Sequence, residues 1–266
     1  MKQTIIIGGG VGPMAGVALH RQIILNTVTE GTDQDHIDVI HLSYASRIAD
    51  RTDYLLNPQD MINPGSAMAE VVEQAYRTVQ ALAKRAAVGI PCNTFHAQEI
   101  FAPFTQQLVR TCPELGILNM LEETGMFIAE AVPGIRRVGL LSTTGTRMSR
   151  VWHNLLEASG MQCIEVAEEL QDRLHTNIYH PTWGIKALSK ASERVRLDFD
   201  GFCQMLIEQG AEVIILGCTE LPLIFPVNSY LGIPLIDPMT ALARSLIRET
   251  SPSQLALLDR KLFTAM

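Results

Sequence analysis

The chain has 266 residues, of which 47% are hydrophobic and 18% are charged, and its formal net charge is -7. Because nucleic acids and anionic membranes select basic surfaces, this charge argues against either of them as a partner. The apolar run that opens the chain stops at Gly8, and no segment reaches the roughly 18 uninterrupted apolar residues of a membrane span. The sequence predicts a cytoplasmic protein with enough apolar material for one large domain or two ordinary ones.

Short apolar runs rich in β-branched residues alternate with longer stretches of helical period, a pattern typical of α/β folds with parallel sheets. Pro13 suits the first turn of a helix after the glycine-rich turn at residues 8–12. In chain order we expect strands at residues 4–7, 37–42, 87–90, 116–118, 138–141, 213–216 and 233–236, and a helix at residues 67–84.

The five cysteines are odd in number and scattered, so they do not form a disulfide framework. Cys112, Cys163 and Cys203 are expected to be small buried hydrophobic residues. Cys92 and Cys218 have a different context, because each directly follows a predicted strand.

Two pairs of segments resemble each other in the same order along the chain. Residues 5–10 (IIIGGG) match residues 138–145 (VGLLSTTG), and residues 88–94 (VGIPCNT) match residues 214–220 (IILGCTE). The sequence therefore indicates two related α/β halves. Each half has a small-residue turn after one strand and a cysteine after another.

Open parallel sheets bind ligands beyond the carboxyl ends of their strands, where Cys92 and Cys218 are expected. If a pseudo-twofold axis relates the halves, the two sulfurs approach one ligand from opposite sides. Inverting a stereocentre by deprotonation needs a base on one face and an acid on the other, and a thiolate with a thiol fills both roles. We expect helix N-termini after the cysteines, capped by Asn93, Thr94 and Thr219, to activate the thiols and bind a substrate carboxylate.

The small-residue turns are expected to belong to the same site. Gly9 and Gly10 let the backbone approach a ligand closely. Thr143 and Thr144 offer hydroxyl and N–H groups to a carboxylate.

At residues 91–96 (PCNTFH) and 217–222 (GCTELP) the chain resembles the paired signatures of the aspartate/glutamate/hydantoin racemase superfamily. Residues 8–13, 49–52 and 138–146 are similar to its aspartate racemase branch, and the resemblance spans nearly the whole chain. It implies an α/β fold of two pseudo-symmetric doubly wound parallel-sheet domains, with the active site in the cleft between them. Residues 1–117 with 226–266 would form the first half, and residues 118–225 the second.

The resemblance also implies racemisation of a small acidic amino acid without pyridoxal phosphate, any other cofactor or a metal, by a homodimer. Cys92 and Cys218 match the catalytic pair, Arg51 matches an arginine that binds the second carboxylate, and Lys186 matches a lysine near the active site. An arginine suits a carboxylate because its planar fork can bind both oxygens. The remaining candidates for substrate binding are Asn93, Thr94, Thr219 and Glu220.

The substrate expected is aspartate rather than glutamate. The glutamate racemase branch usually has an acid in its first glycine turn and a histidine after its second Cys-Thr, where this chain has Gly8 and Glu220. The chain also departs from aspartate racemases, with Val11 for a methionine, Gly16 for a threonine, and residues 41–46 (HLSYAS) for an Asn-rich stretch. Glutamate or another amino acid therefore stays open.

Other functions fit the sequence less well. Residues 10–15 satisfy a dinucleotide pattern, but the second strand lacks the acid that binds the ribose. Cys92 and His96, four residues apart, could bind zinc or form a nucleophile–base pair, yet no further Cys/His cluster completes a metal site. A cysteine hydrolase leaves Cys218 without a role, and a non-catalytic ligand-binding protein on the same scaffold is the remaining alternative.

Overall fold

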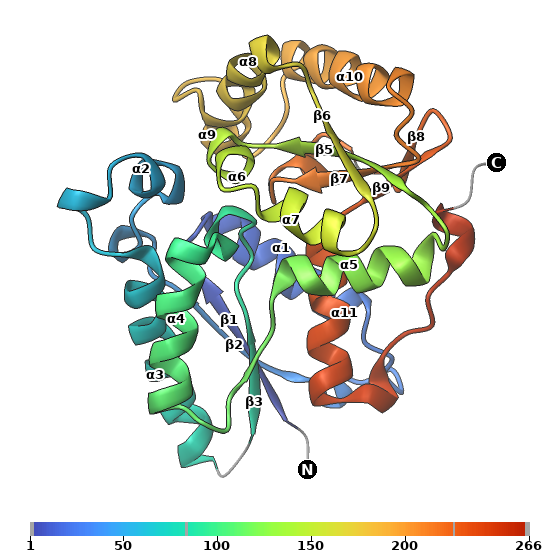
Figure 1. Cartoon of the computed structure of the whole chain (residues 1–266). Coiled ribbons are helices and arrows are strands. Elements are labelled where there is room, and N and C mark those ends of the chain that lie inside the picture. Colours follow the sequence, from blue (N-terminus) through green and yellow to red (C-terminus); the bar gives the residue numbers. More distant parts are fainter. Residues whose placement is uncertain (1–2, 83–84, 226, 264–266) are drawn as a thin grey trace. The chain divides into compact units, whose positions relative to one another are not determined.

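The computed structural model describes residues 3–82, 85–225 and 227–263 (Figure 1). Helices and mainly parallel strands alternate along the chain, so the predicted α/β class is confirmed. The chain divides into two compact units. Unit 1 comprises Met1–Glu123 and Met239–Leu257, and unit 2 comprises Thr124–Pro238 and Leu258–Met266.

Unit 1 is built on a four-stranded parallel sheet with the order β2-β1-β3-β4. Its strands are β1 (Thr4–Gly9), β2 (Asp38–Ser43), β3 (Ala86–Gly89) and β4 (Gly116–Ile117). Its helices are α1 (Pro13–Leu25), α2 (Arg51–Leu56), α3 (Pro64–Ala81), α4 (Gln98–Thr111), the start of α5 (Met120–Ala131), and α11 (Pro238–Thr250). The end predicted for α3, residues 83 and 84, lies outside the described residues.

Helices cover both faces of this sheet, as the continuous hydrophobicity of its strands predicts. All six residues of β1 are buried. On one face, a Cβ added at Gly8 would lie 2.9 Å from Met68 Sδ of α3. On the other face, a Cβ added at Gly89 would lie 3.0 Å from side-chain atoms of Leu242 and Leu246 in α11. The sheet of unit 1 is therefore doubly wound.

The turn between β1 and α1 depends on glycine. Gly10 and Gly12 have φ angles of 91° and 144°, which side chains rarely allow. Pro13 then occupies the first turn of α1, as the sequence predicts.

His41 of β2 fills a space that two glycines leave empty. A Cβ added at either Gly9 or Gly16 would lie 2.3 Å from His41 Nε2. Burial lowers the pKa of His41, and the nearby His20 lowers it further. Two of the departures from the aspartate racemase pattern, His41 and Gly16, are therefore one structural feature, because the glycine in α1 makes room for the imidazole.

Unit 2 contains a five-stranded sheet with the order β6-β5-β7-β9-β8. Its strands are β5 (Arg137–Ser142), β6 (Gln162–Glu165), β7 (Val213–Gly217), β8 (Ser229–Tyr230) and β9 (Ile233–Ile236). Its helices are the rest of α5, α6 (Thr144–Met148), α7 (Val151–Ala158), α8 (Glu168–Tyr179), α9 (Ile185–Leu188) and α10 (Glu193–Glu208). All pairs are parallel except β8 with β9.

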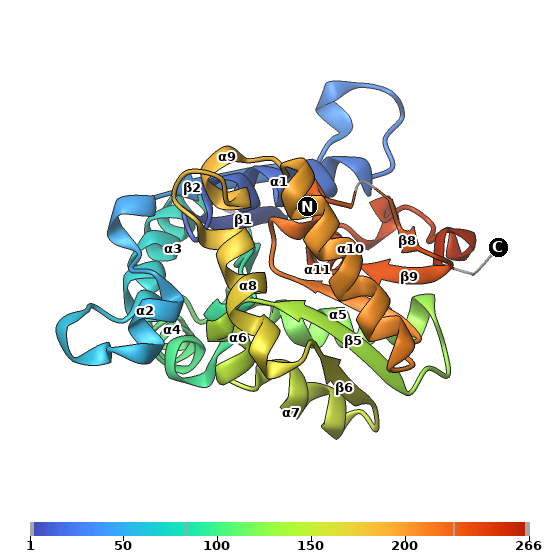
Figure 2. The same ribbon diagram turned by 90° about the horizontal axis from the view of Figure 1, so that it is seen from above.

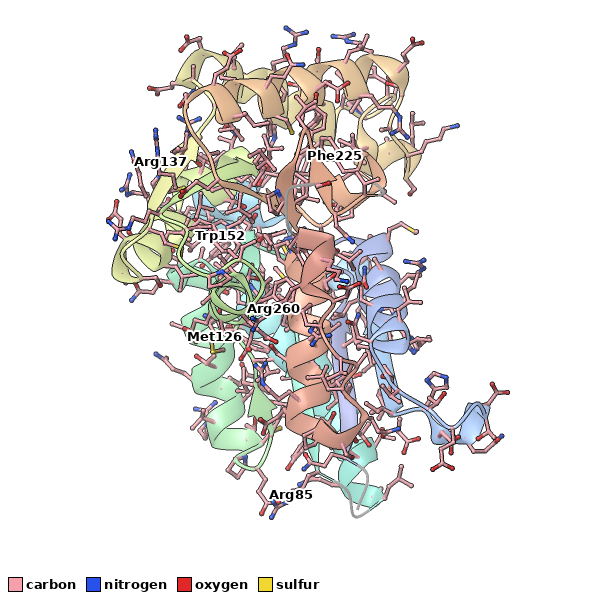
Figure 3. All side chains as sticks on the ribbon, turned by 90° about the vertical axis from the view of Figure 1, so that its right-hand side faces the viewer. Arg85, Met126, Arg137, Trp152, Phe225 and Arg260 are labelled. Atoms are coloured by element: carbon pink, nitrogen blue, oxygen red, sulfur yellow. The ribbon has the colours of Figure 1, made fainter. Side chains whose placement is uncertain are left out.

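The core of unit 2 joins the sheet to α8 and α10, which lie on one of its faces (Figure 2). Their buried residues include Leu174, Phe199 and Leu206. Trp152 of α7, labelled in Figure 3, is fully buried and is among the largest such side chains. Among the described residues, no helix has the length and apolar character needed to cross a membrane.

The first three strands of each sheet follow one order. That order is second, first, third, in β2-β1-β3 of unit 1 and in β6-β5-β7 of unit 2. The next parallel strand is β4 in unit 1 and β9 in unit 2, where the short antiparallel β8 comes before β9 in the chain. Cys92 follows the third strand of its unit and Cys218 the third strand of the other. The topology therefore matches the two related halves expected from sequence, while the pseudo-twofold axis stays a prediction.

The compact units differ from the boundaries expected for the halves. Residues 226–266 were expected in the first half. However, β9 pairs in parallel with β7 of unit 2, and residues 227–238 belong with that unit. Of that segment, only Met239–Leu257, which takes in α11 after its first residue, belongs with unit 1. The first part of unit 1 also extends beyond residue 117, to Glu123. Residues 1–2, 226 and 264–266 lie outside the described chain.

Candidate active site

Cys92 lies just beyond the carboxyl end of β3 and is 8% exposed. His96 holds the loop that carries it: its Nδ1–H donates to the Cys92 carbonyl at 2.9 Å, and its Nε2 accepts from the Met120 N–H at 3.2 Å. Burial lowers the pKa of His96 to about 4, against the hydrogen bond to Cys92, which acts to raise it. Because both ring nitrogens bind backbone groups, His96 stabilises the loop and is not placed as a base for the Cys92 thiol.

Asn93, next in the chain, is 3% exposed, yet neither its Oδ1 nor its Nδ2 has a hydrogen-bond partner among the described residues. Leaving a buried amide without partners costs free energy, so such groups are rare in folded proteins. Thr94 is also buried. The Asn93 amide is therefore available to bind a ligand.

Arg51 is tied to the glycine turn of the same unit. It begins α2, which Asp50 caps by accepting from the N–H groups of Thr52 and Asp53. The Arg51 Nη2 donates to the Val11 carbonyl at 2.6 Å and its Nη1 to the Ala49 carbonyl at 3.2 Å. The structure thus brings Arg51 beside the residue that follows Gly10.

Gly9 and Gly10 lie at the same edge of the first sheet as Cys92 and Asn93. The strands β1 and β3 are direct neighbours, with Ile7 opposite Gly89. The chain therefore brings its unit 1 candidates to one edge, the carboxyl end of the strands, where parallel sheets bind ligands.

Cys218 of unit 2 follows β7 directly and is 6% exposed. Its Sγ–H donates to Glu220 Oε2 at 3.0 Å, and the Thr219 hydroxyl donates to the same oxygen at 3.2 Å. Lys186 of α9 binds the other oxygen, Oε1, at 2.7 Å. Three residues predicted for the site therefore converge on the fourth, Glu220.

Burial and the Glu220 charge raise the pKa of Cys218 well above its usual value, although Lys186 opposes them. Burial also acts to raise the pKa of Glu220, but the charge and hydrogen bond of Lys186 bring it below the usual value. For Lys186, burial acts to lower the pKa and the Glu220 carboxylate raises it. The Lys186–Glu220 pair is therefore ionised, and the Cys218 thiol is neutral.

Thr143 and Thr144 lie at the start of α6, after β5. The hydroxyls of Thr143 and Thr146 are 3.2 Å apart, and the Thr144 N–H donates to His175 Nδ1 at 3.3 Å. Ser142, the last residue of β5, is opposite Gly217 in the sheet, and its buried hydroxyl has no partner among the described residues.

His175 and Tyr179 were not predicted as site residues. Their rings stack at 4.5 Å between centroids, and Lys186 Nζ lies 5.2 Å from the Tyr179 centroid. Their four-residue spacing on one helix face was a usable signal, but nothing in the sequence connected it to Lys186.

The helix N-termini expected after the cysteines are not present. A three-residue 3-10 turn follows each cysteine instead, at Thr94–His96 and Leu221–Leu223, and neither has a side-chain cap. The α-helix after Cys92 begins only at Gln98. A helix dipole therefore does not activate these thiols, and the prediction was wrong on this point.

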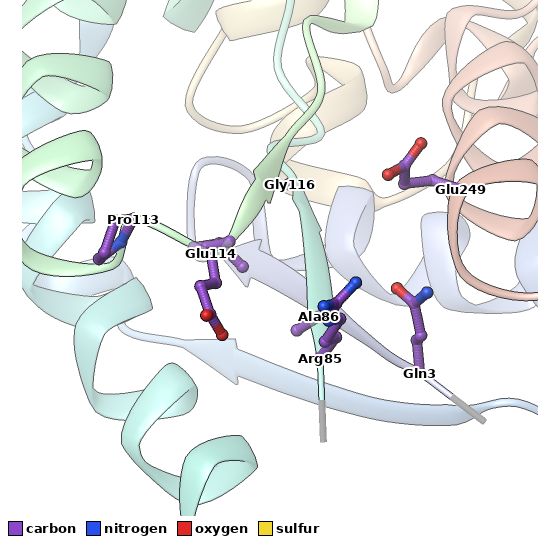
Figure 4. Close-up of a pocket in the computed structure, with 8 residues that line it drawn as sticks. Gln3, Arg85, Ala86, Pro113, Glu114, Gly116 and Glu249 are labelled. Carbon is purple, nitrogen blue, oxygen red and sulfur yellow. The ribbon is translucent and has the colours of Figure 1, made fainter. Parts of the chain in front are cut away.

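A cavity of about 370 Å³ lies at the opposite edge of the first sheet, where its strands begin (Figure 4). Arg85, Glu114 and Glu249 line it together with Gln3 and the first residues of β3 and β4. It contains none of the predicted site residues. Among the described residues, no cluster of three or more His, Cys, Asp or Glu side chains could hold a metal ion. Of the three other cysteines, Cys112 and Cys203 are buried as predicted, and Cys163 is only partly buried.

Comparison with known proteins agrees with this topology. The solved structure of aspartate racemase from Picrophilus torridus is 23% identical, with 99% of each chain covered and a TM-score of 0.74. A glutamate racemase from Francisella tularensis is 14% identical, with a TM-score of 0.56 over 97% of this chain and 84% of that one.

In sequence, a glutamate racemase from Koribacter versatilis is 28% identical over 176 residues, which are 66% of this chain and 49% of that protein. The chain therefore aligns with about half the length of this relative. The family model for Asp/Glu/Hydantoin racemase matches residues 9–246. That match takes in both cysteine segments and every strand after β1, and the chain belongs to the Asp/Glu/hydantoin racemase family.

Proposed function

We propose that this chain is an isomerase, a cofactor-independent racemase of a small acidic amino acid, with aspartate as the first candidate. Cys92 and Cys218 exchange protons at the substrate α-carbon from opposite faces. The observation that supports this most is that a buried cysteine follows the third strand in each of two sheets whose first three strands have the same order.

The residues around the cysteines suit this chemistry. One thiolate removes the α-proton while the opposite thiol donates its own, so two general acid–base steps invert the centre. Charge that moves onto the substrate carboxylate needs hydrogen-bond donors already in place. Asn93, whose buried amide has no hydrogen-bond partner among the described residues, is the strongest donor candidate in unit 1, and the buried Thr143 at the start of α6 is a candidate in unit 2.

Arg51 is the candidate for the side-chain carboxylate. It is 7% exposed and anchored to the Val11 carbonyl, so its guanidinium is held in place before a ligand arrives. A planar guanidinium that can bind two oxygens favours a dicarboxylate substrate. Aspartate is favoured over glutamate because Gly8 and Glu220 stand where glutamate racemases usually have an acid and a histidine.

The proposed enzyme acts in the cytoplasm as a homodimer, without nucleic acid or membrane partners. Its net charge of -7 supports the expectation that it binds neither nucleic acid nor an anionic membrane. The dimer rests on the family resemblance alone, and light scattering after gel filtration tests it.

The test is a screen for α-deuterium. We incubate each enantiomer of aspartate, glutamate and other amino acids with the protein in deuterated water, without cofactor. Deuterium at the α-carbon of aspartate with loss of optical rotation is the expected result, and Cys163→Ala serves as the thiol control. The absence of exchange with every amino acid would refute the racemase. Burst acylation of Cys92 would favour a hydrolase, and binding unaffected by replacing either cysteine would favour a non-catalytic protein.

A further inference from the structure

We infer that Glu220, held by Lys186, keeps Cys218 in its thiol form in the resting enzyme, so that Cys92 is the sulfur that acts first as base. This inference rests on the proposed racemase and assigns the two thiols different starting roles. Glu220 is a positioning residue, because it acts through Cys218.

The hydrogen bonds of Glu220 carry the argument. An ionised carboxylate only accepts, so at 3.0 Å from Oε2 the sulfur must supply the proton. A Cys218 thiolate would place a second negative charge against that oxygen, with the Cys218 and Glu220 side chains both almost fully buried. Two like charges in a poorly solvated place repel strongly, so the thiol is the stable form.

Lys186 keeps Glu220 in its accepting form. Its Nζ is 2.7 Å from Oε1, on the far side of the carboxylate from the sulfur, and its side chain is 24% exposed. Helix α8 adds two ionisable side chains near this cluster, Tyr179, whose ring lies under Lys186, and His175, which stacks on Tyr179. The lysine charge is thus directed mainly at Glu220, and both Glu220 oxygens are occupied without a substrate.

The surroundings of Cys92 differ, because no carboxylate among the described residues accepts a hydrogen bond from its sulfur. His96, which burial keeps neutral, binds the Cys92 carbonyl rather than the sulfur. A neutral ring adds no negative charge against a Cys92 thiolate.

Each proton transfer forms one bond as it breaks another. The Cys92 thiolate takes the α-proton, forming an S–H bond as the C–H bond breaks, and the Cys218 S–H then breaks as a C–H bond forms on the opposite face. The products are a Cys92 thiol and a Cys218 thiolate beside Glu220, which returns to the resting form by exchange with water. Because enantiomers have equal free energy, kcat/KM is the same in both directions, and the asymmetry appears in kcat and KM separately.

The experiment measures alkylation of each cysteine by iodoacetamide across pH, read by mass spectrometry of the peptides. Glu220→Gln removes the carboxylate charge and leaves Lys186, so we expect the midpoint for Cys218 to fall by about one pH unit or more. Lys186→Met should raise it, and Glu208→Gln, an exposed glutamate on α10, should leave it unchanged. The Cys92 midpoint is the internal reference.

A Cys218 midpoint that stays the same or rises in Glu220→Gln would overturn the inference. If an unpaired buried lysine unfolds that variant, the double variant Glu220→Gln/Lys186→Met removes both charges, and its midpoint should also lie below that of the unaltered protein. Alkylation needs no turnover, so the two ideas fail separately. An active racemase without the shift refutes only the role of Glu220, and the shift without α-deuterium exchange refutes only the racemase.

Discussion

The end of β3 in unit 1 and the end of β7 in unit 2 have the same place in the topology but different chemical surroundings. Beside Cys92 lie Asn93, whose amide has no partner among the described residues, and a neutral histidine that holds the backbone. Beside Cys218 lies the ion pair of Lys186 with Glu220, and the buried Glu220 carboxylate accepts a hydrogen bond from the thiol. The shared topology therefore decides where the two thiols lie, whereas the charges next to each thiol decide whether that thiol is protonated.

The largest expected effect on racemisation comes from removing either of the two sulfurs. Cys92→Ala and Cys218→Ala should each lower racemisation by about 10³-fold or more, since each removes a general acid or base. Cys218→Ala should keep α-deuterium exchange with one enantiomer, because Cys92 is the resting base, whereas Cys92→Ala should lose exchange with both. Full activity in both variants would refute the two-thiol mechanism.

Replacing Arg51 tests the part proposed for unit 1 alone, which is recognition of the substrate side chain. Losing a charged hydrogen-bond partner costs about 1.5–3 kcal/mol, so Arg51→Ala should reduce kcat/KM for dicarboxylates by roughly 10- to 100-fold. Monocarboxylate amino acids should be affected far less. Arg47→Ala is the matched control, since Arg47 forms an exposed ion pair with Glu70. Equal losses on both substrate classes would remove Arg51 from recognition of the side chain.

Asn93 separates binding from folding on the Cys92 side. Neither amide atom has a protein partner among the described residues, so Asn93→Ala should weaken substrate binding by about tenfold while costing little stability. Asn63, which caps α3 and donates to Tyr54 Oη and the Glu99 carbonyl, is the control. Asn63→Ala should cost about 1–2 kcal/mol of unfolding free energy. Urea unfolding with substrate titration distinguishes the two, and a large stability loss in Asn93→Ala would argue for a structural role.

The smallest effect concerns Gly16 of α1 and its packing against His41 of β2. Gly16→Ala would place a Cβ 2.3 Å from His41 Nε2, so it should lower the unfolding free energy by about 1–3 kcal/mol. Gly201→Ala in α10 has open space around its Cβ and should raise it by up to about 1 kcal/mol. Replacing His41 by Ser in the Gly16→Ala background should restore stability. No rescue in thermal unfolding would show that His41 and Gly16 are not coupled.

The sequence predicted the buried strands well, because short continuous apolar runs such as β1 and β7 are typical of parallel strands covered on both faces. It missed β6 and β8. Strand β6 lies at the edge of its sheet and buries only Ile164, and β8 has two residues. Neither produces a clear hydrophobic pattern.

The sequence predicted which candidate residues lie at the strand ends but not the contacts among them. The cysteine motifs located both strand ends, yet the capping residues after them fit a 3-10 turn as well as a helix, which explains the wrong expectation. The ion pair of Lys186 with Glu220 joins residues 34 apart, and the packing of His41 against Gly16 joins different elements. Only the folded chain reveals such pairs, because their spacing follows no local period.

The central claim is that two separate groups handle the proton on the two faces of one carbon. The most direct measurement follows L-aspartate in deuterated water at low conversion, with both enantiomers separated and their α-hydrogen content measured. The account predicts that the D-aspartate formed carries solvent deuterium while the remaining L-aspartate is unlabelled. Equal labelling of both enantiomers, or D-aspartate that retains the original hydrogen, would contradict it.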